Sequence, residues 1–234
     1  LHGSSAASDV YKRQIRTLTR HIAGENVKKS NLKRLGALPQ VCEPIGEIDD
    51  HLESLSGAEG DPTHLYHSGL KVLQSVLERV GAGLSPLNDE LCMIAHRVMA
   101  GPVSRLESVL GLLAGSLGRE HASSLHMARA LSQSTLSDDS RAEVMTMHHL
   151  GLMAIASEDP LRASFLFEKA AEQSSFSNKT RLTNLVAAGI SRHLVGEDEV
   201  AKSLISGASK IVAKDTESAI DPLLDFARSL MGID

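Results

Sequence analysis

The sequence predicts an all-α protein, a right-handed stack of antiparallel helical hairpins, and three observations support this. A pattern of small and large residues occurs three times with identical internal spacing. From about residue 62 onward, apolar residues follow the 3.6-residue period of a helix between Gly and Pro breaks. Aromatic residues make up only 3% of the 234 residues and Trp is absent, which favours interlocked helices over a sheet.

The repeated pattern places a glycine in a first helix and three spaced residues in a second helix. The three copies are Gly111, Ser123, Met127, Ala130; Gly151, Ala163, Phe167, Ala170; and Gly189, Ala201, Ile205, Ala208. Successive copies are 40 and then 38 residues apart, which is typical of stacked hairpins joined by linkers of variable length. We expect each glycine to face the Ser or Ala of its second helix. The large residue should then fill the gap beside the next hairpin.

This order of small and large residues resembles the tetratricopeptide family over about residues 104–215. The middle copy, around Leu150-Gly151, matches best, whereas in the first copy Glu107 stands where the others have Met147 and Leu185. The family unit has about 34 residues, so the extra residues are assigned to the polar stretches SQSTLSDDSR and QSSFSNKTR. The resemblance implies an α-solenoid in which the first helices line a concave groove.

The segment before residue 62 is expected to lie outside this repeat. Residues 1–14 resemble translated adapter or vector sequence, so we expect the genuine N-terminus to be missing. Residues 15–61 carry a basic block and then an acidic block, which predicts short helices and linker. The basic block could bind nucleic acid or an acidic membrane. Pairing with the acidic block is the simpler interpretation, because no aromatic residues or recognisable nucleic-acid module accompany it.

The helical-repeat domain is predicted at residues 62–234. An atypical first hairpin should break at GAGLSP and end at Gly101-Pro102, and Asp221-Pro222 indicates the start of a last helix. We expect hairpins at about 62–101, 104–137, 144–177 and 182–215, and a C-terminal capping helix at 221–231.

No motif for catalysis, a cofactor or a metal stands out. His64 and His67 could share a helical face, but no Cys or acidic residue lies nearby at ligand spacing. Metalloprotease, phosphate-loop, nucleophile-elbow and dinucleotide fingerprints are all missing. Cys42 and Cys92 lack the paired spacing of a zinc site or a disulfide framework, which favours a reducing compartment. We therefore expect no enzyme activity, no cofactor and no metal, and an enzyme with a helical fold has no residue set to support it.

The resemblance instead implies a peptide-binding groove. Carried over to this chain, its wall is Arg105, Ser108, Leu112, Met145, His148, Leu152, Ile155, Val186, Ile190 and His193. The wall is mostly apolar, and the Lys and Asn residues with which chaperone-binding members hold a C-terminal carboxylate are absent. An amphipathic helix or an extended peptide suits such a wall. Equally, residues 15–60 or a larger parent protein could fill it.

The expected function is a non-enzymatic scaffold that binds another protein in this groove. The alternative is the C-terminal sensor or dimerisation arm of a larger regulator whose N-terminal effector part is missing. No run of about 18 apolar residues occurs, so a membrane partner is not expected. Nucleic acid is not an expected partner, self-association stays open, and the expected location is the cytoplasm.

Overall fold

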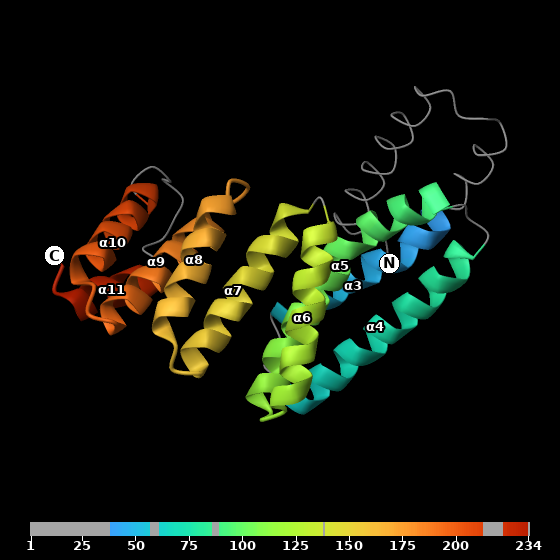
Figure 1. Cartoon of the computed structure of the whole chain (residues 1–234), viewed down its shortest axis with the longest axis horizontal. Coiled ribbons are helices and arrows are strands. Elements are labelled where there is room, and N and C mark those ends of the chain that lie inside the picture. The colour runs from blue at the N-terminus through green and yellow to red at the C-terminus, as the bar shows by residue number, and fades with distance from the viewer. Residues whose placement is uncertain (1–37, 57–60, 86–88, 138, 213–221, 234) are drawn as a thin grey trace, which may run out of the picture. The chain divides into compact units, whose positions relative to one another are not determined.

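The computed structural model describes residues 38–56, 61–85, 89–137, 139–212 and 222–233 (Figure 1). Within these ranges every regular element is an α-helix and there is no strand, so the all-α class is confirmed there. The chain divides between residues 138 and 139 into two compact units, where the sequence predicts one domain from 62 to 234. None of the described helices is both long enough and apolar enough to cross a membrane.

Unit 1 contains α3 (Leu38–Ser56), α4 (Pro62–Leu84), α5 (Asp89–Ser116) and α6 (Glu120–Leu136). Asp61 begins α4 because its carboxylate accepts a hydrogen bond from the Thr63 amide at 3.1 Å, and Pro62 suits the first turn. Helix α5 packs against α3, α4 and α6. The core of this unit is formed by apolar residues of the first three helices, among them Ile48, Val76, Leu106 and Leu110.

Helix α3 differs from the short helices and linker that the sequence predicts for residues 15–61. It is a single helix of 19 residues, and its Ile48 is fully buried in the core of unit 1. Its carboxylates Glu47 and Asp49 pair with Arg79 of α4 and Arg105 of α5. Every Lys and Arg of the basic block lies outside the described residues, so the pairing of the two blocks stays a prediction.

Helix α5 corrects the predicted break at Gly101-Pro102. Proline removes one backbone donor and normally ends or kinks a helix. Here, however, a continuous helix of 28 residues runs through Pro102. Met99, Val103 and Leu106 are buried on both sides of the proline, so tertiary packing outweighs the local preference. The expected atypical hairpin at 62–101 and the first repeat hairpin at 104–137 therefore share the helix α5.

Unit 2 contains α7 (Ser140–Ala156), α8 (Pro160–Gln173), α9 (Asn178–Leu194), α10 (Asp198–Val212) and α11 (Pro222–Met231). Side chains of Asp139, Asp159 and Ser177 accept backbone amide protons at the starts of α7, α8 and α9, which explains these boundaries. Each helix from α7 to α10 packs on the next one along the chain, and α11 packs on α9 and α10. The predicted cap residue Asp221 lies outside the described residues.

The repeated glycines make the same contact in all three copies. A Cβ added to Gly111 would lie 2.9 Å from the Met127 side chain, one on Gly151 would lie 2.6 Å from Phe167 Cε1, and one on Gly189 would lie 2.8 Å from Ile205 Cδ1. The prediction that the glycine faces the Ser or Ala holds for Gly111, whose carbonyl accepts a hydrogen bond from the Ser123 hydroxyl at 2.7 Å, and for Gly189, where an added Cβ would lie 3.3 Å from the Ala201 carbonyl oxygen. The prediction that the large residue fills the gap beside the next hairpin is wrong in detail. The glycine makes room for the large residue of its own helix pair, which is buried in each case.

Candidate functional site

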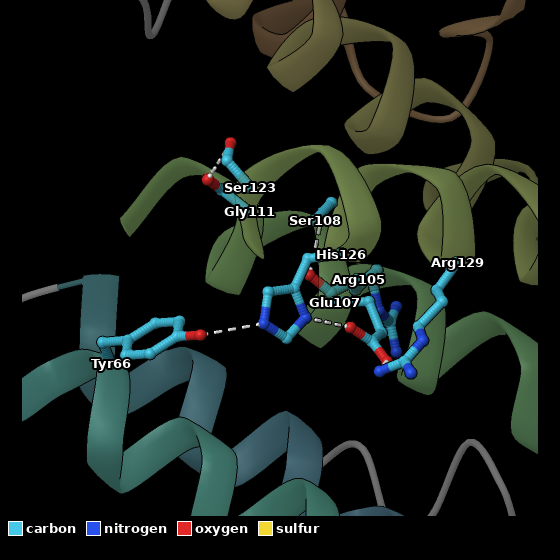
Figure 2. Close-up of polar contacts among 8 residues, drawn as sticks. All are labelled: Tyr66, Arg105, Glu107, Ser108, Gly111, Ser123, His126 and Arg129. Carbon is cyan, nitrogen blue, oxygen red and sulfur yellow. Dashed lines mark hydrogen bonds and ion pairs between the residues drawn. The ribbon is translucent and has the colours of Figure 1, made fainter. Parts of the chain in front are cut away.

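A buried chain of polar side chains links three helices of unit 1 (Figure 2). Tyr66 of α4, Glu107 of α5 and His126 of α6 are 6%, 4% and 5% exposed. His126 Nδ1 lies 2.5 Å from Glu107 Oε2, and His126 Nε2 lies 3.1 Å from the Tyr66 hydroxyl. The apolar surroundings weaken competition from water, so this chain ties α4, α5 and α6 together.

Hydrogen-bond chemistry assigns the protons in this chain. A carboxylate oxygen only accepts, so the Nδ1–H of His126 donates to Glu107. In the neutral ring Nε2 is then the acceptor, and the Tyr66 O–H donates to it. Arg129 Nη1 lies 3.9 Å from the second Glu107 oxygen, and the Arg119 guanidinium lies 5.2 Å from the Tyr66 ring centre.

The arrangement has the parts of an acid–base relay, namely a carboxylate, an imidazole and a hydroxyl. A relay acts on a substrate only where its last group can reach one. The Tyr66 side chain is covered by its neighbours, so in this conformation the chain acts as a structural contact among helices. Among the described residues there is also no group of three or more side chains suited to a metal ion.

The sequence-based site did not include Tyr66, Glu107 or His126. One feature of the sequence could have indicated this buried polar chain. Glu107 occupies a position at which the other copies have the apolar residues Met147 and Leu185. The His126 position is equally informative, since the other copies have Leu166 and Leu204 there. The register thus marks both positions as polar exceptions among the copies, and the structure shows that the two side chains are partners.

The predicted groove residues of the first copy are engaged within unit 1. Arg105 Nη2 lies 2.5 Å from Asp49 Oδ1 of α3, and the Ser108 hydroxyl donates to the Arg105 carbonyl at 2.8 Å (Figure 2 shows Arg105 and Ser108). Ser108 is fully buried, so its prediction as an accessible wall residue is wrong. Leu112 is half-buried. The contact of Arg105 with α3 favours the alternative for this part of the wall, in which the N-terminal segment fills the groove.

The second-copy residues lie along one face of α7. Leu152 and Ile155 are 41% and 37% exposed, and Met145 is half-buried. His148 Nδ1 donates to Asn184 Oδ1 of α9 at 2.9 Å, and its ring centre lies 5.4 Å from that of Phe167. The hydrogen bond links the first helices α7 and α9 of two successive copies, and the ring contact joins α7 to α8.

The third-copy residues are less accessible than the sequence predicts. Val186 is fully buried, because α11 packs on α9 and Leu224 of α11 joins the same apolar cluster. Its assignment to an open wall is therefore wrong. Ile190 packs against that cluster and is half-buried, while His193 Nδ1 lies 2.7 Å from Asp198 Oδ1. The accessible part of the predicted wall in unit 2 is thus concentrated on α7.

Burial of His148 gives unit 2 a predicted pH dependence. Desolvation lowers the pKa of His148 below its ordinary value, and the bond to Asn184 opposes this only in part. Below about pH 6.5 the unfolded chain binds a proton that the folded chain resists, so unfolding becomes easier as the pH falls. Urea midpoints measured across this range should fall more steeply for the native chain than for a His148→Leu variant. Parallel pH profiles would contradict this assignment.

Comparison with protein-family models finds no matching family, and searches among curated proteins and solved structures give no significant match. The resemblance to the tetratricopeptide family therefore stays a prediction from the residue pattern.

Proposed function

We propose that unit 2 is a tetratricopeptide-like module that binds an apolar helix or an extended peptide of another protein without catalysis. The observation that carries this proposal is the exposure of Leu152 and Ile155 on one face of α7. Large apolar side chains that share an exposed face are typical of interaction sites. In this proposal the helix pairs α7–α8 and α9–α10 are antiparallel hairpins of one stack.

Neighbouring residues extend the proposed surface. Met145, Leu152 and Ile155 follow helical spacing, so they lie along a single stripe. Ile190 of α9 is partly exposed and occupies the position that Leu152 has in the preceding copy. The hydrogen bond from His148 to Asn184 holds α7 beside α9, which supports a binding surface shared by the two first helices.

A selection from a displayed peptide library tests this proposal. Peptides selected on the native chain should be rich in apolar residues. A Leu152→Asp, Ile155→Asp double variant should bind them at least about tenfold more weakly, because a charge replaces apolar contact at the centre of the surface. Fluorescence anisotropy with a labelled selected peptide measures the affinities.

Phe165→Asp provides the matched control, because Phe165 is 57% exposed on the second helix α8 and lies outside the proposed surface. This variant should bind the peptide as the native chain does. Unchanged binding by a folded double variant would rule out the α7 surface. An equal loss in both variants would show that binding is not specific to that face.

A further inference from the structure

We propose that the surface formed by α4 and α5 in unit 1 is a receptor site for acidic amphipathic helices, and that α3 is its tethered occupant. A partner protein with such a helix would bind by displacing α3. This site lies in unit 1 and shares no residue with the proposed α7 surface of unit 2.

Charge complementarity defines the two edges of the site. Arg79 of α4 contacts both carboxylate oxygens of Glu47, with its Nη1 donating to Oε1 at 2.8 Å. On α5, Arg105 Nη2 lies 2.5 Å from Asp49 Oδ1, and the two side chains are only 11% and 17% exposed. Guanidinium groups suit carboxylates because they present several donors in a fixed plane. The surface therefore favours carboxylates on both sides of a bound helix.

An apolar strip lies between these edges. Successive helical residues are rotated by about 100°, so Glu47 and Asp49 flank Ile48 on opposite sides. Ile48 is fully buried in the cluster that contains Leu106 and Leu110 of α5. Leu52, one turn later, packs on the same cluster. This is the pattern of an amphipathic helix held in a groove.

The fit of α3 in this site is imperfect, which makes displacement feasible. His51 Nε2 is buried and has no hydrogen-bond partner. It faces Gly69 of α4, where an added Cβ would lie 3.6 Å from it. A buried polar atom without a partner weakens the contact that contains it. Burial also lowers the pKa of His51, as expected for an imidazole with poor solvation.

The remaining helices have contacts that do not depend on α3. The core of unit 1 includes Val80, Leu91 and Ala95 of α4 and α5. The two hydrogen bonds that join His126 with Tyr66 and with Glu107 tie α4, α5 and α6 together. The contacts of α3 define the partner helix that we expect. It carries an aliphatic residue between two carboxylates, a second aliphatic residue four positions later, and an apolar residue at the place of His51.

Exchange of α3 tests the proposal in the full chain. A protease site is inserted between Ser56 and Asp61, and a fluorescent peptide of residues 38–56 is added before and after cleavage. Anisotropy should show at least about tenfold tighter apparent binding after cleavage, because the cut helix loses the roughly millimolar effective concentration that its tether provides. A His51→Leu peptide should bind more tightly than the native peptide, and an Ile48→Asp peptide should not bind.

Charge reversal gives the specificity control. Arg105→Glu should abolish binding of the native peptide and allow an Asp49→Arg peptide to bind. Arg97→Glu makes the same charge change at an exposed residue of α5 and should have no effect. The peptide variants keep the test valid even where a chain variant fails to fold.

Three results would overturn the proposal. The cleaved chain could fail to bind the native peptide, or bind the Ile48→Asp peptide equally well. Circular dichroism could show that cleavage unfolds unit 1, which would make α3 an integral part of its fold. Sedimentation could show a dimer of the uncut chain that Asp49→Arg dissociates, which would assign the site to a second copy of this chain.

Discussion

A His126→Leu substitution is expected to lower the free energy of unfolding of unit 1 by roughly 1.5–3 kcal/mol. It removes the imidazole that donates to Glu107 at 2.5 Å and leaves a carboxylate that is only 4% exposed. Arg129, at 3.9 Å, is too distant for a hydrogen bond to that carboxylate. Urea unfolding followed by circular dichroism measures the loss.

The other copies supply a matched control for this prediction. Where the first copy has Glu107 and His126, the middle copy has Met147 and Leu166. A Glu107→Met, His126→Leu double variant replaces the polar pair with that apolar pair. It should recover much of the stability, with a coupling energy of about 0.5–3 kcal/mol between the two sites. Simple addition of the two single losses would show that the residues do not act as a pair.

The second large effect is expected at the helix crossing of the middle copy. Gly151→Leu should lower the free energy of unfolding of unit 2 by about 1–3 kcal/mol, because a side chain there overlaps the buried Phe167. An added Cβ alone would lie 2.6 Å from the Phe167 ring. Ala163→Leu should have a similar effect, since Ala163 is fully buried in the same helix pair.

Gly207→Leu is the control for Gly151→Leu. Gly207 also lies within a helix, α10, but a Cβ added there meets no atom within 4 Å. Because leucine favours helix more than glycine does, this variant should be neutral or stabilised by up to about 1 kcal/mol. Equal urea midpoints for the Gly151 and Gly207 variants would show that the repeat register is wrong.

The helices of the three copies could be predicted from spacing because each pair is a local unit. Gly111 and Met127, for example, are close enough in sequence for one hairpin register to bring them into contact. Local signals gave a wrong prediction for α5. The local signal of Gly101-Pro102 indicates a break, but the buried residues on both sides stabilise a continuous helix.

The prediction of an accessible groove is wrong where distant segments of the chain cover the wall residues. Asp49 of α3 pairs with Arg105, and Leu224 of α11 packs in the cluster that buries Val186. Neither contact can be inferred from the spacing of the wall residues. Leu152 and Ile155 stay exposed on α7, so the proposed binding surface is smaller than the sequence suggests.

The sequence by itself determined the all-helical class of the described residues and the contact of each repeat glycine's helix with its partner helix. Helical periodicity and small-residue spacing are local properties, and they depend on residues within one hairpin. Only the tertiary structure decided which faces are accessible and which polar residues become partners. Burial and pairing depend on segments far apart in the chain, as in the contact between Tyr66 and His126.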